Sequence, residues 1–271
     1  DTNRLIFGGT MLQVRNERGT LVYSRIKSKE ASEKIVYNTL TVPVRERFQL
    51  VLADGTKVFL NSGSEMRYPE RFGKARREVF LKGEAWFEVA KDSAREFWVH
   101  AGAMDVKVLG TSFNVKAYER LETVATTLVE GSVEVACAGK SFQIVPGEQF
   151  VYDKNNRVMD VRMVDTESYV SWKDGYYKFR QTTLEEIMET LSVWYGLNVF
   201  YVNESAKQVE FTGKVRRYED ARMLLDKFEQ TGDVVFDIKG NNVFITIKQK
   251  KPFAREWNSF LVKARGMVWQ S

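Results

Sequence analysis

Short alternating strands between glycines constrain the fold of this chain more than any other feature of its sequence. Between residues 77 and 115, apolar side chains recur at every second position, as at Val79, Leu81, Ala85, Phe87 and Val89. This period places them on one face of a pleated strand. Turn-forming glycines follow one another at short intervals from about residue 35 to residue 164. The pattern predicts an all-β unit, either a sandwich or a coiled solenoid of short strands.

One turn in this unit is predicted in detail. Asp54 and Gly55 lie between two short apolar runs, residues 48–52 and 57–60. Because Asp and Gly tolerate the positive φ angles of a tight turn, the two runs are expected to pair as a hairpin. Other glycines, Gly83 among them, are expected to allow backbone conformations closed to other residues, and Asn61 and Asn114 are expected to satisfy turn amides.

The apolar period changes after Thr166, and this change predicts a second domain. A helix is expected from about residue 184 to residue 195, with Thr182 and Glu185 as a capping box and Gly196 at its end. A second helix is expected over 218–230. Strands are predicted on either side of each helix, at 176–179, 198–202, 209–215 and 234–238, with a final hairpin strand at 243–247. The fold class is therefore mainly β with α+β, and the second domain is a small duplicated β-α-β unit.

The length and the charge exclude several classes of protein. A chain of 271 residues with 44% hydrophobic content favours two domains. The longest nearly apolar run, 193–202, is far shorter than the ~20 residues that cross a bilayer. The net charge of +5 equals the charge of residues 248–271 alone, which we expect to be a solvated basic tail. A nucleic-acid interface needs a clustered basic face, so we do not expect one here. The chain begins at Asp1 without a signal peptide, and we expect a fragment or a processed form.

The residues that usually carry chemistry are scarce. The single cysteine, Cys137, is expected to be a small buried hydrophobic residue, and the single histidine, His100, cannot build a multi-histidine metal site. Glu84 and Glu88 fall on the same face of one strand, a pairing that could serve glycoside hydrolysis. We favour the alternative that both belong to a solvated outer face of that strand. The sequence therefore predicts no enzyme activity, no cofactor and no metal site.

A family resemblance rests on a series of segments in a fixed order. LADGTKVFLNSGS, YPERF, REVFLKGEAWFEVAKD, VLGTSFNV, LVEGSVEV and VPGEQ resemble the FecR family of periplasmic sensor and anti-sigma proteins. Further on, WKDGYYKF, LEEIMETLSVWYGLNVFY and VEFTGKV resemble the C-terminal domain that accompanies FecR domains in Bacteroidetes-type anti-sigma factors. That domain is similar to the small secretin and TonB-receptor N-terminal fold. One departure is Val44-Arg45-Glu46, where relatives tend to carry a glycine before the Glu.

The resemblance divides the chain into four parts. Residues 1–44 would be a membrane-proximal stalk that packs on the first domain, with strand-like pieces at 11–14 and 20–24. The FecR domain would be 45–165, the secretin/TonB-N-terminus-like domain 166–247, and the basic tail 248–271. The resemblance also implies a place on the periplasmic side of the inner membrane, below a membrane helix that this chain does not include.

The resemblance implies a sensor that works by protein contact. Its partners would be the signalling domain of a TonB-dependent outer-membrane transporter and, through a cytoplasmic segment outside this chain, an extracytoplasmic-function sigma factor. We expect the transporter domain to add a strand to an open edge of the second domain, with aromatic anchors. The candidate anchors are Tyr176, Tyr177, Trp194 and Tyr201, although Trp194 is equally compatible with a core position. The alternative is a periplasmic carbohydrate-binding module in which Trp86 or Trp98 stacks on a sugar ring.

Overall fold

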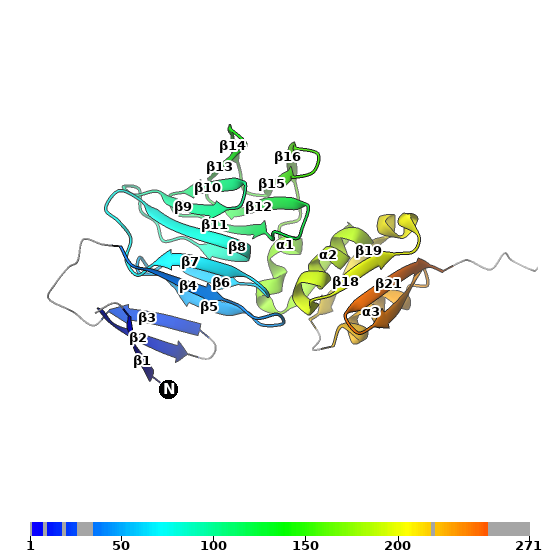
Figure 1. The fold of residues 1–271 in the computed structure, drawn as a ribbon. Coiled ribbons are helices and arrows are strands. Elements are labelled where there is room, and N and C mark those ends of the chain that lie inside the picture. Colours follow the sequence, from blue (N-terminus) through cyan, green and yellow to red (C-terminus); the bar gives the residue numbers. More distant parts are fainter. Residues whose placement is uncertain (1, 8–9, 18–19, 26–34, 218–219, 249–271) are drawn as a thin grey trace, which may run out of the picture.

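The computed structural model describes residues 2–7, 10–17, 20–25, 35–217 and 220–248, and side chains from residue 35 onward. Figure 1 shows a β-rich domain followed by a smaller domain of helices and strands. This arrangement agrees with the predicted fold class. Among the described residues, no helix is long and apolar enough to cross a membrane. The basic tail lies outside the described residues, apart from Lys248.

The β-rich domain is built from short strands. Its strands are β4 (Tyr37–Thr41), β5 (Phe48–Val51), β6 (Lys57–Leu60), β7 (Glu65–Pro69), β8 (Arg77–Glu88), β9 (Phe97–Ala101), β10 (Met104–Val108), β11 (Ser112–Ala117), β12 (Thr123–Glu130), β13 (Val133–Cys137), β14 (Lys140–Ile144), β15 (Glu148–Asp153) and β16 (Val158–Met163). Three more strands precede them, β1 (Thr2–Phe7), β2 (Thr10–Glu17) and β3 (Thr20–Arg25).

The long strand β8 joins two layers of a sandwich. Its second half pairs with β6 and β11 in layer 1, whose order is β5-β6-β8-β11-β12-β15-β16. Its first half pairs with β7 and β9 in layer 2, whose order is β4-β7-β8-β9-β10-β13-β14. One hydrophobic core draws side chains from both layers. Of the two predicted alternatives, the structure therefore has the sandwich.

The predicted alternation along β8 is confirmed. Val79, Leu81, Ala85 and Phe87 all point into the sandwich core. Gly83 lies between the two halves of the strand with a φ angle of +108°. A Cβ atom at this position would come within 2.7 Å of the Ser64 Cα. Only glycine accepts both the angle and the close approach, so Gly83 lets one strand serve two layers.

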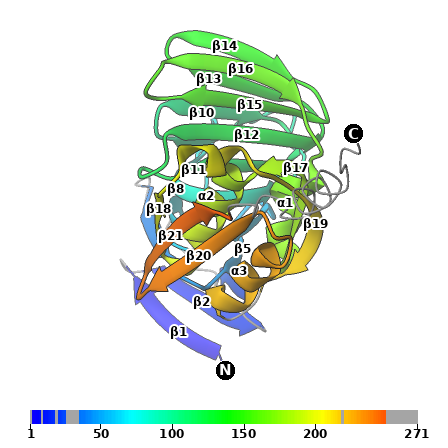
Figure 2. The same cartoon turned by 90° about the vertical axis from the view of Figure 1, so that its right-hand side faces the viewer.

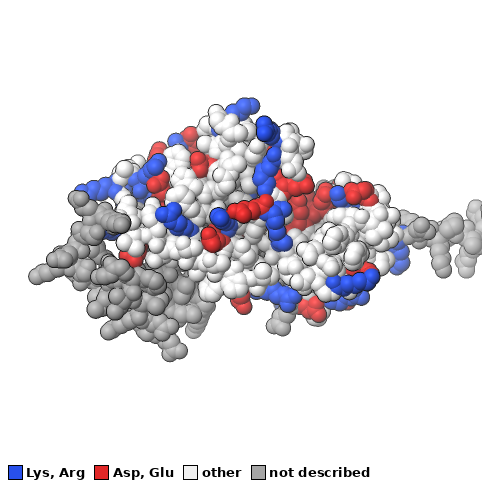
Figure 3. All heavy atoms as spheres, viewed as in Figure 1, with Lys and Arg blue, Asp and Glu red and all other residues white. Residues whose placement is uncertain are grey.

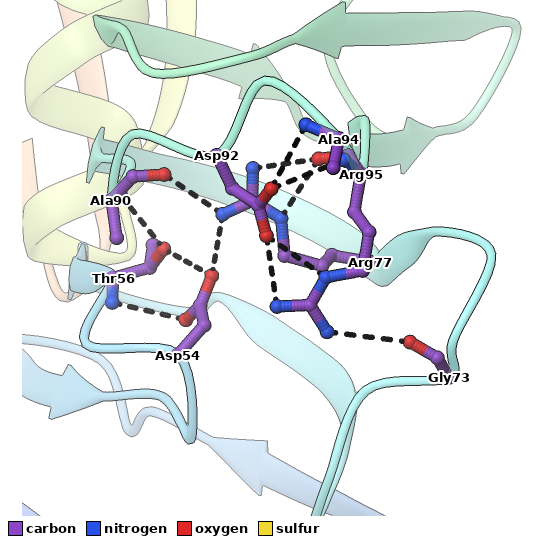
Figure 4. Close-up of polar contacts among 8 residues, drawn as sticks. All are labelled: Asp54, Thr56, Gly73, Arg77, Ala90, Asp92, Ala94 and Arg95. Atoms are coloured by element: carbon purple, nitrogen blue, oxygen red, sulfur yellow. Dashed lines mark hydrogen bonds and ion pairs between the residues drawn. The ribbon is translucent and has the colours of Figure 1, made fainter.

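The Asp54-Gly55 hairpin is also confirmed, since β5 and β6 pair across it. Asp54 has a second role, because its carboxylate forms an ion pair of 2.8 Å with the fully buried guanidinium of Arg77. Arg77 also donates to the carbonyls of Ala90 and Arg95 (Figure 4). These bonds satisfy a charge that would otherwise be costly to bury, and they hold the hairpin against the loop before β9.

The N-terminal region contains the strands predicted at 11–14 and 20–24, which lie within β2 and β3. β3 pairs in parallel with β5 and thereby extends layer 1. β4, although it falls within the range 1–44, pairs with β7 and belongs to layer 2. The sandwich therefore begins before residue 45.

The second domain follows a short connection after β16. Its elements are α1 (Glu167–Val170), the 3₁₀ helix η1 (Ser171–Asp174), β17 (Tyr176–Thr183), α2 (Leu184–Tyr195), β18 (Asn198–Tyr201), the 3₁₀ helix η2 (Glu204–Gln208), β19 (Glu210–Arg216), α3 (Ala221–Glu229), β20 (Val234–Lys239) and β21 (Asn242–Ile247).

The two predicted β-α-β units are present in chain order, but their strands are distributed over two sheets. β17 pairs with β19, while β18, β21 and β20 form a separate sheet in that order. The predicted cap of α2 is wrong by one residue, because Thr183 caps the helix and its hydroxyl accepts from the amide of Glu186. Thr182 lies in β17. Gly196 ends α2 with a φ angle of +68°, as predicted. α3 begins at Ala221, about three residues later than predicted, because Asp220 has an extended backbone and its carboxylate caps the helix by accepting from the amide of Arg222.

Candidate functional site: the interface between the two domains

The second domain covers the outer face of layer 1. In Figures 1 and 2, α2 lies between the sandwich and the sheet of β18, β21 and β20. Trp86 points outward from β8 and is only 5% exposed, because it packs into the hydrophobic core of the second domain, to which Trp172 also belongs. Its indole N–H donates to Glu88 Oε1 at 3.2 Å. Burial of a Trp side chain against another domain stabilises their contact by about 2 kcal/mol or more.

The prediction of a solvated outer face is wrong for Glu84. This carboxylate is only 7% exposed, whereas Glu88 at the end of the same face is half-buried. A period of two distinguishes the two faces of a strand, but it does not show whether a second domain covers the outer one. The two carboxylates therefore lie in different environments.

Glu84 is the centre of a hydrogen-bond network that crosses the interface. Asn61 and Asn114 each donate a side-chain N–H to it, at 2.8 and 2.9 Å. The Oδ1 of Asn114 in turn accepts the indole N–H of Trp172, at 3.2 Å. Burial raises the pKa of Glu84, and nearby Lys116 and the two amides oppose that rise. The network therefore links β8 and β11 of the sandwich to η1 of the second domain.

A second group of contacts holds the C-terminal end of α2. The hydroxyl of Ser62 lies 3.2 Å from the carbonyl oxygens of both Val193 and Trp194 and donates to them. A separate contact reaches η1, where the carbonyl of Lys173 accepts from the guanidinium of Arg47. The last carbonyls of a helix lack partners within the helix, so Ser62 satisfies groups that would otherwise be buried without a bond.

Charged side chains border the interface. Lys116 pairs with Glu189 and Arg162 with Glu186, each at 3.7 Å. Figure 3 shows acidic and basic side chains interspersed over this view of the described residues, with an acidic group where the two domains meet. The Arg162–Glu186 pair is exposed, and a pair of this kind is worth about 0–1 kcal/mol, whereas Lys116 and Glu189 are half-buried.

A cavity of about 180 Å³ remains inside the interface. Part of its polar lining is internally paired, since Gln149 donates to Thr127 Oγ1 at 2.9 Å and accepts from Arg162 at 3.2 Å, whereas the buried hydroxyl of Ser168 has no hydrogen-bond partner among the described residues. We interpret the interface as a contact between domains, because the Glu84–Asn114–Trp172 network and the burial of Trp86 join them.

The predicted partner-binding residues divide into two pairs. Tyr177 and Trp194 are buried, at 4% and 7% exposure, so they cannot serve as surface anchors in this structure. Trp194 occupies the core position that the sequence left open, with the guanidinium carbon of Arg217 3.5 Å from its ring centroid. Tyr176 and Tyr201 are half-buried and reach the surface. Tyr176 donates to Glu167, and Tyr201 lies at the edge of its sheet.

The remaining candidate residues lie in the sandwich. Cys137 is buried as predicted, and burial raises the pKa of its thiol. His100 lies 2.7 Å from Asp105 and stacks on Phe80. In the described parts of the chain, no group of three or more His, Cys, Asp or Glu side chains is placed to hold a metal ion.

Neither candidate for sugar stacking presents a free ring. Trp86 is buried under the second domain. Trp98 has His100 stacked against it, with ring centroids 6.2 Å apart, and the ammonium of Lys107 5.7 Å from its centroid. The structure therefore offers little support for a sugar-binding surface at either residue.

Sequence reasoning missed the polar residues of the interface. Asn61 does accept the Ser62 amide, as predicted, but Asn114 lies inside β11 and bridges Glu84 to Trp172. The only sequence pattern that could have indicated them is a run of polar residues at every second position, and this pattern equally predicts a solvated face. Pairing across domains does not follow from local spacing.

The geometry defines a two-domain β-rich protein whose domains are joined through buried polar and aromatic contacts. Residues 38–134 match the family model described as FecR protein, and residues 176–245 match the model described as FecR, C-terminal. The chain belongs to the FecR family. The predicted order of the two domains agrees with these matches.

Solved structures support the same assignment. The chain is similar to two crystal structures of a candidate anti-sigma factor from Parabacteroides distasonis, with identities of 28% and 27% and a TM-score of 0.70 for each. Each match covers 78% of this chain and 99% of the solved chain. No curated protein matches this chain.

Proposed function

We propose that this chain is the sensor region of a transmembrane anti-sigma factor. It stands on the periplasmic side of the inner membrane, receives a signal from a TonB-dependent outer-membrane transporter, and controls an extracytoplasmic-function sigma factor. Its second domain, which we regard as similar to the secretin and TonB-receptor N-terminal fold, takes the transporter's signalling domain. Signal transfer then requires contact between proteins and no conversion of a substrate.

The observation that carries the proposal is the pairing of the two FecR family domains in one body. A solved candidate anti-sigma factor is similar to 78% of this chain over 99% of its own length. A sensor must couple the domain that binds its partner to the rest of the molecule. The contacts of Trp86, Asn114 and Ser62 with the second domain supply a physical connection of this kind.

The proposal is tested by titrating the full chain with isolated signalling domains of TonB-dependent transporters from the same organism. One of these domains should bind in a calorimeter with 1:1 stoichiometry. Tyr176→Ala and Tyr201→Ala should each weaken that binding about tenfold, as expected for aromatic anchors, without a loss of secondary structure. Phe142→Ala, on the far layer of the sandwich, serves as the control that should bind normally. Absence of binding to every signalling domain would contradict the proposal.

A further inference from the structure

The sheet of β18, β21 and β20 has two edges, and one of them is blocked. At the β20 edge, the amide of Phe236 donates to Glu229 Oε1 at 2.6 Å. The carbonyl of the same residue accepts from Arg222 Nη1 at 3.3 Å. Both side chains come from α3. The backbone groups at the middle of β20 are therefore already occupied, which protects this edge from further pairing.

The opposite edge, β18, is open. β18 runs parallel to β21. The amide of Asn198 donates to the turn before β21, and the amide of Val202 donates to β21 itself. In a parallel pair, alternate residues direct both backbone groups to the neighbouring strand. Val199 and Tyr201 therefore direct theirs away from β21. Within the described part of the chain, the backbone groups of these two residues make no hydrogen bond.

Apolar side chains lie along this open edge on the outer face of the sheet, which is directed away from the sandwich (Figure 2). Phe200 and Val202 are 47% and 62% exposed. Phe200 stacks on Phe244 of β21, with ring centroids 5.1 Å apart. β19 also has a free edge, but its exposed side chains are polar: Glu210, Thr212, Lys214 and Arg216. β18 therefore combines an apolar surface with unpaired backbone groups, the two features that favour pairing with a strand of another protein.

The other side of the β18 edge is acidic. Tyr201 reaches the start of α2, where its hydroxyl donates to the carbonyl of Leu184 at 3.5 Å. Around it lie the carboxylates of Glu185 and Glu204, which share the single ammonium of Lys207 at 3.4 and 2.8 Å. Burial, and then these carboxylates and Glu189, raise the pKa of the Tyr201 hydroxyl. The local charge is therefore negative.

We propose that the free edge of β18 takes up an extended segment of the partner, whose side chains alternate between apolar and basic. The segment's backbone pairs with Val199 and Tyr201. Its apolar side chains lie beside Phe200 and Val202, and its Lys or Arg side chains face Glu185 and Glu204. Main-chain bonds supply affinity in such strand addition, and the alternating side chains supply selectivity. This inference rests on the proposed function and specifies where the transporter domain binds.

The test uses the signalling domain that binds the full chain, with Val199→Pro as the central variant. Proline removes the amide that points to the free edge and leaves the pairing with β21 intact. We expect at least a tenfold loss of affinity with little change in Tm. Val202→Lys should weaken binding comparably, whereas Val235→Lys, on the same outer face at the blocked β20 edge, should not. Reversal of both Glu185 and Glu204 to Lys should weaken binding and remove most of its dependence on salt.

Hydrogen exchange of the complex gives an independent readout. The amides of Val199 and Tyr201 should exchange rapidly in the free chain and at least tenfold more slowly in the complex. If the signalling domain binds but these amides stay unprotected and Val199→Pro binds normally, the inference about β18 is wrong while the proposed function stands. If no signalling domain binds the unaltered chain, the proposed function fails and the inference fails with it.

Discussion

The two halves of β8 have the same alternation of inward and outward side chains, but only the second half is covered on its outer side. In the first half, Glu78 and Phe80 lie half-buried on the outer face of layer 2. In the second half, Glu84 and Trp86 are buried under the second domain. The inner side chains of both halves belong to the same core. Local sequence thus determines which side of the strand faces the core, and a distant part of the chain determines what covers the other side.

The difference between the two halves of β8 bears on the proposed sensor function. A surface that another domain covers can transmit the position of that domain, whereas a solvated surface cannot. Glu84, Asn114 and Trp172 form such a contact, with polar groups that lose their partners if the domains separate. We therefore expect substitutions in the second half of β8 to affect both stability and signalling.

The largest loss of stability is expected at Arg77, which carries a buried charge in the first half of β8. Arg77→Ala removes one partner of a buried ion pair and leaves Asp54 without its guanidinium, at a cost of about 3–5 kcal/mol in the free energy of unfolding. Arg76→Ala, the exposed neighbour that pairs with Glu78, should cost less than about 1 kcal/mol. Urea denaturation measures both values. Equal losses would mean that Arg77 is not buried as described.

Trp86 and Trp98 test the covered and uncovered faces directly. Trp86→Ala should lower the free energy of unfolding by about 3 kcal/mol, because it opens a cavity between the domains. Trp98→Ala, on the outer face of layer 2, should lower it by about 1 kcal/mol. Proteolysis of the connection at 164–166 should also become faster in the first variant only. Similar behaviour of the two variants would break the comparison.

Gly83 tests the point where β8 passes from one layer to the other. Gly83→Ala should cost about 2 kcal/mol, since the new methyl group meets the Ser64 backbone at an unfavourable φ angle. Gly102→Ala shares the positive φ angle but has open space around it, so it should cost only about 1 kcal/mol. Thermal denaturation followed by circular dichroism distinguishes the two. A larger loss at Gly102 would contradict the crowding argument.

The smallest effect is expected at Glu84 and depends on pH. Folding raises the pKa of this carboxyl above its usual 4.5, so its protonation stabilises the folded state. That contribution is fully present below pH 4.5 and is lost as the pH rises through the folded-state pKa. Glu84→Gln should cost about 1 kcal/mol and remove this component of the pH dependence.

The pH effect is measured as the difference in unfolding free energy between the unaltered chain and the Glu84→Gln variant. The difference should be largest at low pH and should shrink as the pH rises. Glu88→Gln provides the same chemical change outside the buried network. A difference that grows with pH would show that Glu84 favours its ionised form in the folded chain.

Much of the fold follows from local sequence because its determinants are local. The alternation of β8, the Asp54-Gly55 hairpin and the end of α2 at Gly196 each depend on residues close together in the chain. The choice of sandwich over solenoid did not follow, because it depends on which strands pair. The one-residue error at the cap of α2 arose because Thr182 and Thr183 are adjacent and both can accept a helix amide.

The interface was less predictable than either domain. The spacing of Glu84 and Trp86 is the same on a solvated face and on a covered one, and only the packing of the second domain distinguishes the two. The aromatic anchors show the same limit, since Tyr176 and Tyr177 are neighbours on one strand and only Tyr177 is buried. Such distinctions depend on residues far apart in the sequence.

Hydroxyl-radical footprinting of the whole chain, read residue by residue in a mass spectrometer, tests most directly whether the second domain covers the outer face of layer 1. The structure predicts that Trp86 and Trp172 are oxidised much more slowly than Trp98. Oxidation of Trp86 as fast as Trp98 would mean that the domains do not dock through β8, and the account of a coupled two-domain sensor would be contradicted.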